Sequence, residues 1–494
     1  MPFLIENIIK VVFALLVLIV IGNFVLIGLA ISRRQRREKY FQRIDAVRAE
    51  FRPVVGEVLS GRMEYQEGLK RLQQISGLDR LYLLEQLLLE KKPNPTEEPI
   101  LRRLCEDLGL VRIWQNRVKG HVDTASVREA VGRPEGILER VGRLRFLIRA
   151  KSAENLGIIR HRDSWPLLVK ALDDPHPDIQ SVAARALAAI RETESFPALV
   201  AQLHKVVLDA SATALSLRSV KSALVSFPLD CAPALVRSLQ HPNRRIRFLA
   251  TDILREMVLR EANGDGQYDL DRKRVGVEIV EIFLTQLPFD ENPDVRARSA
   301  AVIAFLPDPR STPALLTLLR DDTWFVRLHA VRALARRKFL SQAAEIGQAL
   351  SDPNWRVREA AVATLRTYGA AGLNQLTAHF IHTDDAYSRE QVADEFQRAG
   401  LIPDLLQRYA SEDDSQAAQV LNRMARMGKT GYLVSVLSAD AQPALRKKFL
   451  LNFARNPDPQ IRQWVERVAS QEPDPDLRSV AAAALEPPSA AGEA

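Results

Sequence analysis

Arginine recurs in this chain at a fixed interval of 31 residues, at Arg296, Arg327, Arg358 and Arg389. Each arginine follows a short polar turn that contains Asp or Asn, and small and apolar residues follow it at three- and four-residue steps. Such steps place one apolar stripe on a helix that packs against its neighbours. A second apolar helix precedes the turn, as in residues 313–319. The spacing therefore predicts an all-α solenoid of stacked helix pairs.

Composition agrees with a helical fold. Hydrophobic residues make up 47% of the 494 residues and charged residues 26%, which excludes wholesale disorder. Aromatic residues are only 6%, and Ala, Leu, Val and Arg dominate. The two cysteines, Cys105 and Cys231, form no paired motif, so we expect buried thiols and neither a disulfide framework nor a Cys-rich zinc site.

The repeat pattern, L-x-x-L-L followed by D-x-x-x-V-R-x-x-A-x-x-A-L, resembles the HEAT family, especially its short bacterial form of about 31 residues. The resemblance covers residues 145–395 well and residues 396–485 weakly. Gln180 stands where an early repeat should have Arg, and the turn at 241–247 lacks the Asp. The resemblance implies structural ladders between repeats, formed by Arg296, Arg327, Arg358 and Arg389 with Asp321, Asp322 and Asp352.

The N-terminal region predicts one transmembrane helix. Val11 to Ile31 contains a single polar side chain, Asn23, and spans about 31 Å as a helix. A cleaved signal peptide is the alternative, since residues 28–30 resemble a cleavage site, but the length of the run and the basic cluster that follows favour an uncleaved anchor. That cluster consists of Arg33, Arg34, Arg36, Arg37 and Lys39.

The basic cluster predicts topology. By the positive-inside rule, the N-terminus lies outside and residues 33–494 lie in the cytoplasm, on the inner membrane of what we expect to be a bacterial cell. The same charges either act on topology alone or also bind anionic lipid headgroups. We expect a membrane anchor at 1–32, a juxtamembrane helical region at 33–144 with a linker near 91–99, a HEAT solenoid at 145–395, degenerate helical repeats at 396–485 and a disordered tail at 486–494.

The net charge of +8 does not predict nucleic-acid binding. Residues 1–150 hold 26 Lys and Arg against 18 Asp and Glu, whereas residues 151–494 hold 43 of each. The excess therefore lies beside the membrane segment, and the repeats have no net basic footprint. No nucleic-acid partner is expected.

Two constellations were weighed as metal sites. The interval from Arg247 to Arg296 is 49 residues, and its insertion, Glu261 to Arg272, resembles an EF-hand loop. Glu at the first position and Arg at the last depart from that motif, so an inserted Asx- and Gly-rich loop is the preferred interpretation. His379 and His382, with Asp384 and Asp385, have loose metal-ligand spacing, but the repeat turn already explains the two Asp residues. We expect no metal and no cofactor.

Trp324 and Trp355 occupy equivalent positions in adjacent repeats. They either pack in the core beside the turn or form an exposed aromatic pair that contacts a partner. No phosphate loop, nucleophile elbow or dinucleotide motif is present. We expect no catalytic activity and no small-molecule substrate.

These features predict a membrane-anchored scaffold that binds protein partners of unknown identity. Membrane-tethered HEAT proteins resemble accessory subunits of envelope machinery, for example of a membrane glycosyltransferase. The alternative is an enzyme similar to the HEAT-like bilin lyases or isomerases, or to the HEAT-like DNA glycosylases. A charge-neutral repeat body and a membrane anchor favour the scaffold.

Overall fold

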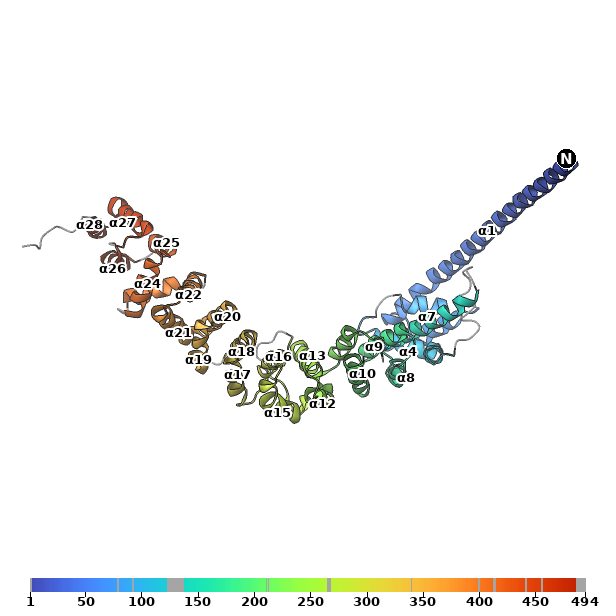
Figure 1. The fold of residues 1–494 in the computed structure, drawn as a ribbon, viewed down its shortest axis with the longest axis horizontal. Coiled ribbons are helices and arrows are strands. Elements are labelled where there is room, and N and C mark those ends of the chain that lie inside the picture. Colours follow the sequence, from blue (N-terminus) through green and yellow to red (C-terminus); the bar gives the residue numbers. More distant parts are fainter. Residues whose placement is uncertain are drawn as a thin grey trace, which may run out of the picture. The chain divides into compact units, whose positions relative to one another are not determined.

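The computed structural model describes residues 2–77, 80–90, 93–121, 137–209, 211, 213–263, 268–338, 340–398, 400–411, 415–439, 442–454 and 456–485. These residues form α-helices and short 3-10 helices, and none of them lies in a strand (Figure 1). The predicted all-α, HEAT-like fold is confirmed. The expected tail at 486–494 lies outside the described residues.

The chain divides into two compact units, residues 1–228 and 229–494. Unit 1 contains ten α-helices among its described residues, with short 3-10 turns between the later ones. Their bounds are α1 Pro2–Leu59, α2 Tyr65–Gln73, α3 Arg80–Leu88, α4 Glu98–Asp107, α5 Leu110–Val118, α7 Ile137–Ile158, η1 Arg162–Ser164, α8 Trp165–Ala171, α9 Pro177–Ile190, η2 Thr193–Ser195, α10 Phe196–Leu208 and α11 Leu217–Val225.

Unit 1 packs its first helices onto the C-terminal part of α1. Ile44, Val54 and Val58 of α1 are buried, and α2 and α3 contact this helix. Gly68 of α2 permits the close approach, because a Cβ atom there would lie 2.1 Å from Val58 Cγ2. The stripe that the sequence predicted over residues 41–58 is therefore the packed face of α1.

Unit 2 carries most of the 31-residue pairs. Its elements are η3 Leu229–Leu235, α12 Val236–Leu239, α13 Arg244–Ala262, α14 Arg272–Val275, α15 Val277–Thr285, η4 Leu287–Phe289, α16 Pro293–Ile303, α17 Ser311–Leu319, α18 Trp324–Arg337, η5 Leu340–Gln342, α19 Ala343–Gln348, η6 Ala349–Ser351, α20 Trp355–Arg366, α21 Gly369–His382, α22 Ala386–Arg398, α23 Leu401–Ser411, α24 Ser415–Arg426, α25 Gly431–Ala439, α26 Pro443–Phe453, α27 Pro459–Gln471 and α28 Pro475–Leu485.

Small buried residues set the spacing between the second helices of successive pairs. Helix α16 packs on α18, and α18 packs on α20. Ala300, Ala330 and Ala361 lie at equivalent positions of these helices and have no exposed surface. Their small side chains let the helix backbones approach, and larger residues such as Leu334 and Leu365 fill the layers between pairs.

Late in unit 2, two turn signatures lie only 16 residues apart, at 456–462 and 473–478. The first opens α27 and the second opens α28, and the two helices pack on each other. Asp458 caps α27 by accepting from the backbone N–H of Gln460 at 2.8 Å. Each signature thus begins one of two consecutive helices, which explains the short spacing.

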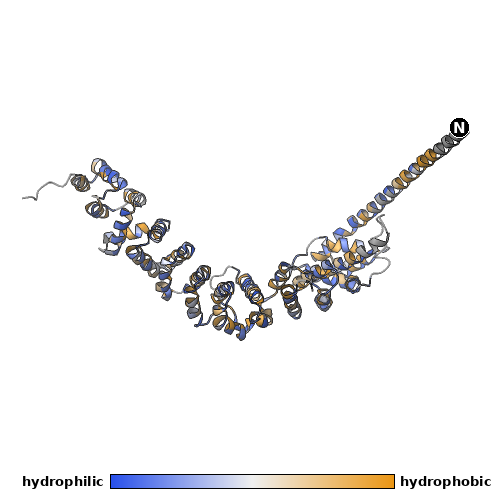
Figure 2. Cartoon of the chain, viewed as in Figure 1, coloured by the Kyte–Doolittle hydropathy of each residue, from blue (hydrophilic) through white to orange (hydrophobic). Residues whose placement is uncertain are grey.

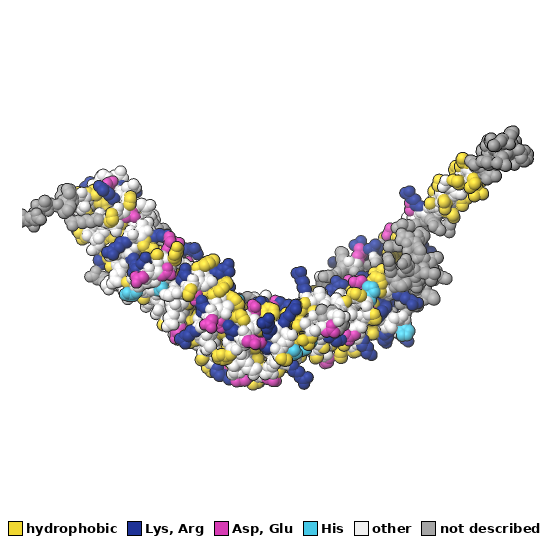
Figure 3. Space-filling model, in the orientation of Figure 1, with side chains coloured by type: hydrophobic (Ala, Val, Ile, Leu, Met, Phe, Trp, Pro, Cys, Tyr) yellow, Lys and Arg dark blue, Asp and Glu magenta, His cyan; other side chains and the backbone are white. Residues whose placement is uncertain are grey.

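Helix α1 contains the apolar stretch. Residues Leu15–Ser32 have a mean hydropathy of 2.7, and none of this window is buried. Figure 2 shows the same stretch as a band of hydrophobic colour, and Figure 3 shows apolar side chains covering its surface. By length and composition this helix can cross a membrane, and a signal sequence would meet the same criteria.

Candidate functional site at the inter-helix turns

The turns between paired helices are built around an Asp that contacts two repeats. Asp321 accepts the backbone N–H of Thr323 at 2.8 Å, which closes its own turn. The same carboxylate accepts two hydrogen bonds from Arg296 of the preceding repeat, at 2.6 and 2.9 Å. Asp352 repeats both contacts, with Asn354 at 2.8 Å and with Arg327 at 2.6 and 2.8 Å. Paired bonds of this kind fix the register of one repeat on the next.

Each ladder arginine also binds the turn of its own repeat. Arg327 Nη1 donates to the carbonyl oxygens of Asp321 and Asp322, at 2.7 and 3.0 Å. The side chain of Asp322 is exposed, so this residue joins the ladder only through its backbone. The arginine therefore connects two consecutive turns, one through backbone carbonyls and the next through a carboxylate.

Charge pairing keeps the ladder ionised. Hydrogen bonding to Asp321 raises the pKa of Arg296, and hydrogen bonding to Asp352 raises the pKa of Arg327. Burial by itself would raise the pKa of Asp321. Hydrogen bonds from Arg296 and from the backbone N–H of Thr323 outweigh burial and hold that pKa below its usual value.

The ladder begins earlier than the sequence analysis placed it. Arg247 pairs with Asp290 at 2.7 and 3.1 Å, across the long insertion. In unit 1, Arg149 pairs with Asp174, and Gln180 donates to the carbonyl of Asp174 at 2.7 Å, as a ladder arginine would. The signal for Arg149 was present in the sequence, because Arg precedes its Asp by 25 residues here and in the pairs of Arg296 and Arg327.

The carboxylate contacts stop at Arg358. Its Nη1 donates to the carbonyl of Asp352 at 2.8 Å, but the position 25 residues ahead is Thr383, which has no carboxylate. The Nε of Arg358 is buried without a hydrogen-bond partner. Arg389 likewise donates only to the carbonyl of Thr383, at 3.3 Å, and its Nε has no partner. The resemblance assigned both arginines to the ladder, and here they lack its acidic half.

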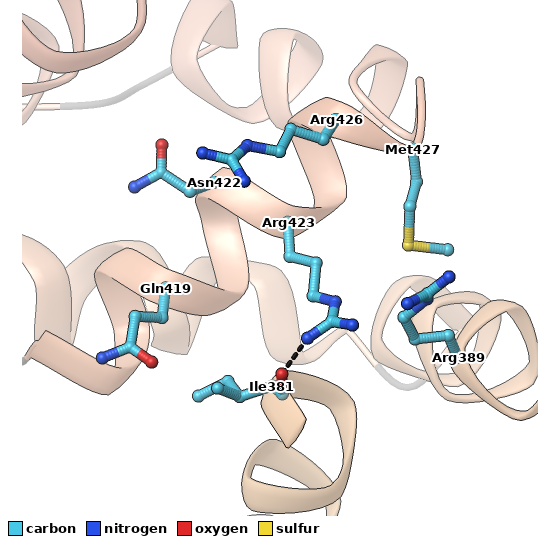
Figure 4. Close-up of a pocket in the computed structure, with 7 residues that line it drawn as sticks. All are labelled: Ile381, Arg389, Gln419, Asn422, Arg423, Arg426 and Met427. Atoms are coloured by element: carbon cyan, nitrogen blue, oxygen red, sulfur yellow. Dashed lines mark hydrogen bonds between the residues drawn. The ribbon is translucent and has the colours of Figure 1, made fainter. Parts of the chain in front are cut away.

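An open cavity of about 690 Å³ lies beside this interruption (Figure 4). Three arginines line it, Arg389 from α22 and Arg423 and Arg426 from α24. Arg423 points toward α21, where it donates to the carbonyl of Ile381 and, at 2.7 Å, to that of Thr383. Neutral residues complete the lining: Ile381, Gln419, Asn422 and Met427. Sequence reasoning missed Arg423 and Arg426, because no repeat signature marks α24.

The two tryptophans differ in exposure. Trp324 is half-buried and contacts Phe325 edge to face, with ring centroids 5.8 Å apart. Trp355 is 54% exposed. The guanidinium carbon of Arg356 lies 5.4 Å from both indole centroids, so it joins the two rings by cation–π contacts. On the next repeat, Tyr387 is 77% exposed at the position equivalent to Arg356.

The insertion that resembled an EF-hand loop uses several of its acidic groups within the chain. Glu261 pairs with Arg274 at 2.6 Å, and Asp269 pairs with Arg337. Asp271 caps α14 through the N–H of Lys273 at 2.8 Å. Residues 264–267 lie outside the described residues.

The two histidines near the α21–α22 turn do not converge. His379 Nε2 lies 2.7 Å from Ser388 Oγ, and burial lowers the pKa of His379, an effect that Asp385 opposes. His382 is exposed. Over the part of the chain that the structure describes, no three His, Cys, Asp or Glu side chains are grouped to hold a metal ion. Cys105 and Cys231 are buried free thiols.

The basic cluster after the apolar stretch lies on α1. Arg34 Nε donates to Glu38 at 3.0 Å, one turn further along, and both side chains are exposed. Lys39 is exposed as well. The side chains of Arg33, Arg36 and Arg37 lie outside the described part of the helix. The cluster is thus carried by a continuous helix and not by a loop.

Comparison with known proteins gives one family. The description HEAT repeats matches residues 137–218, 280–346 and 326–397. No curated protein matches the sequence. Among solved structures, an engineered protein shares 17% identity over 75% of this chain and 98% of its own, with a TM-score of 0.34. Importin beta shares 11% identity over 91% of this chain and 75% of its own, with a TM-score of 0.33.

A human enzyme is also similar. Deoxyhypusine hydroxylase shares 14% identity over 60% of this chain and 99% of its own, with a TM-score of 0.23. The matched ranges of the family coincide with α7 to the start of α11 and with α15 to α22. The second of these segments contains the ladder pairs of Arg296 and Arg327.

Proposed function

We propose, from the premise that this chain is a HEAT-repeat protein, that it is a membrane-anchored scaffold for protein partners on the cytoplasmic side of a bacterial inner membrane. The observation that carries the proposal is the pairing of a repeat domain with helix α1. The apolar window Leu15–Ser32 has no buried surface, and burying it in water-excluding surroundings is strongly favourable. A bilayer supplies such surroundings.

Charge supports the orientation. Arg33, Arg34, Arg36, Arg37 and Lys39 follow the apolar window directly, whereas Lys10 is the one basic residue before it. The positive-inside rule then assigns residues 33–494 to the cytoplasm. Within that compartment we propose an accessory role in envelope machinery, for example beside a membrane glycosyltransferase. The proposal includes no catalytic step.

The partner-contact surface that we propose is the exposed edge formed by Trp355, Arg356 and Tyr387. Trp, Tyr and Arg are the residue types that contribute most binding energy in protein interfaces. Trp355 and Tyr387 are exposed on neighbouring repeats, and Arg356 holds the Trp355 indole in place by a cation–π contact. Trp324 is half-buried and supports this edge from below.

Cell fractionation tests the anchor and its orientation. The full chain should sediment with membranes and resist extraction by high salt, and a chain that starts at Phe41 should not. A matched control changes two apolar residues outside the window, Leu451 and Leu485, to Ser and should leave sedimentation unchanged. A C-terminal reporter that is active outside the cell would contradict the orientation.

Co-purification in mild detergent tests the scaffold. The full chain should recover a defined set of proteins, and the Trp355→Ala Tyr387→Ala variant should recover less of it. Leu451→Ala, at a side chain that is also exposed, is the control and should recover the full set. Recovery of no protein by the full chain would refute the scaffold.

A further inference from the structure

The three arginines of the cavity between α21, α22 and α24 have no acidic counterpart. In the ladder, Arg247, Arg296 and Arg327 each contact a carboxylate. Across the described residues, no carboxylate forms an ion pair with Arg389, Arg423 or Arg426. Asp385, which is near in sequence, accepts the backbone N–H of Tyr387 at 3.0 Å. The cavity therefore concentrates positive charge that the fold itself does not neutralise.

The arginines are held in place before any ligand arrives. Arg389 and Arg423 both donate to the carbonyl oxygen of Thr383, at 3.3 and 2.7 Å, which brings two guanidinium groups to one acceptor. Like charges repel at this distance, so an anion between them is favourable. Arg426 is exposed at the rim, and no protein contact restrains it. Preorganised donors lose little conformational freedom when a ligand binds.

We propose that this cavity binds an anionic side chain of a protein partner, a carboxylate or a phosphoryl group, which the planar guanidinium groups contact through paired hydrogen bonds. The proposal rests on the scaffold function and specifies the chemistry of the partner. Gln419 and Asn422 line the same cavity, and their amides can bind the backbone of the partner segment.

Charge distribution favours a protein partner over a nucleic acid. Residues 151–494 hold equal numbers of basic and acidic residues, so the repeats lack the extended basic surface that a phosphate backbone needs. A cavity with three arginines and a short neutral lining fits one or two anionic groups on a peptide. Duplex DNA therefore serves as a contrasting ligand in the test.

The chain has an acidic segment of its own close by in sequence. Glu412, Asp413 and Asp414 directly precede α24, and Asp414 follows Arg389 by the ladder spacing of 25 residues. These residues lie outside the described part of the chain. The test therefore includes a variant, Asp413→Asn with Asp414→Asn, that removes their charge.

Fluorescence anisotropy of labelled peptides, with the full chain in detergent at low salt, tests the proposal. A peptide with four Glu residues and its phosphoserine counterpart are the probes, and the same peptide with Gln is the negative control. We expect binding of one or both anionic peptides and none of the Gln peptide, and the stronger anionic probe identifies the group that the cavity prefers. Arg426→Gln should weaken binding about tenfold, the loss of one charge-assisted contact.

Arg320→Gln is the matched control, because it removes one positive charge from an exposed residue at the end of α17, away from the cavity. It should leave the affinity within about twofold of wild type. Equal losses from Arg320→Gln and Arg426→Gln would overturn the proposal, because they would indicate attraction to net charge alone. So would tighter binding of duplex DNA than of either peptide.

Binding that appears only in the Asp413→Asn Asp414→Asn variant would also overturn the proposal, since the cavity would then belong to the chain's own acidic segment. Arg423→Lys, which keeps the charge and loses the planar donor pair, should weaken binding less than Arg423→Gln. Failure of all peptide binding would leave the membrane and co-purification results untouched, so the scaffold function and this inference fail separately.

Discussion

Two neighbouring parts of unit 2 use the same arginine position in different ways. In the paired segment, α13 to α18, Arg247, Arg296 and Arg327 each contact an Asp. In the unpaired segment, α20 to α24, Arg358 and Arg389 donate to backbone carbonyls, and the described residues give them no carboxylate. The helices continue across both segments. The fold therefore tolerates loss of the acidic partner, and the difference indicates stability in one segment and binding in the other.

Breaking a pair should have the largest effect. Asp352→Ala removes the carboxylate that contacts Arg327 and the cap on Asn354, and it leaves a half-buried guanidinium without a partner. We expect a loss of about 3 kcal/mol in the free energy of unfolding, measured by urea denaturation of the full chain. Asp322→Ala, at the adjacent exposed carboxylate, should cost less than about 0.5 kcal/mol. Equal losses would mean that the ladder contributes no stability.

Repairing the unpaired segment should have a smaller effect of opposite sign. Thr383→Asp places a carboxylate at the ladder position ahead of Arg358, whose Nε is buried without a partner. We expect a gain of about 1 kcal/mol in the free energy of unfolding. The same change should weaken anionic peptide binding by adding negative charge beside Arg423.

Thr383→Asn is the matched control for the repair. Its side chain can still accept the N–H of Asp385, as the Thr383 hydroxyl does at 3.3 Å, and it brings no charge. It should leave both stability and peptide binding near wild type. A gain from Asn equal to the gain from Asp would assign the effect to capping of the turn.

Acid should distinguish the two segments through their histidines. Burial lowers the pKa of His329 in α18, and Arg332, Arg298 and Arg255 lower it further. The unfolded chain therefore takes up a proton that the folded chain resists, and stability falls as the pH drops below about 6.5, the unfolded value. His329→Gln should flatten this pH dependence in denaturation measurements between pH 7 and about 5.

His379 in the unpaired segment provides the comparison. Burial lowers the pKa of His379 too, but Asp385 opposes the shift. His379→Gln should therefore flatten the pH dependence less than His329→Gln. The reverse order would show that the arginines around His329 are screened by solvent.

The smallest effect is expected at the exposed edge. Trp355→Ala should change the free energy of unfolding by less than about 0.5 kcal/mol, because the indole is mostly in solvent. Trp324→Ala should cost about 1 kcal/mol, since it removes the contacts with Phe325 and Arg356. Thermal unfolding followed by circular dichroism measures both. A large loss from Trp355→Ala would make that residue structural and not a contact for a partner.

The repeat spacing predicted the helical fold because each turn needs the same few residues at the same positions. It missed Arg149 and Gln180 because their repeats lack part of the signature, although the offset of 25 residues to the next Asp was present for Arg149. It also placed Arg358 and Arg389 in the ladder, since the arginine persists where the aspartate does not. Spacing identifies a position in a repeat and not the partner across it.

The cavity could not be predicted in the same way. Its arginines come from α22 and α24, which are 34 residues apart between Arg389 and Arg423, and only the first belongs to a recognisable repeat. The two side chains meet because both donate to the carbonyl of Thr383, and a backbone acceptor leaves no trace in a sequence pattern. Sites built on backbone groups therefore require coordinates.

Helix α1 runs without interruption to Leu59, and its packed face begins at Ile44. The 12 residues from Ser32 to Ile44 rise by about 18 Å as a helix. A stiff spacer of this length holds the first helices of unit 1 at a constant height above the lipid headgroups, whereas a Gly- and Ser-rich linker would let that height vary. Cargo held by those helices would meet membrane enzymes whose reactive groups lie at that same height.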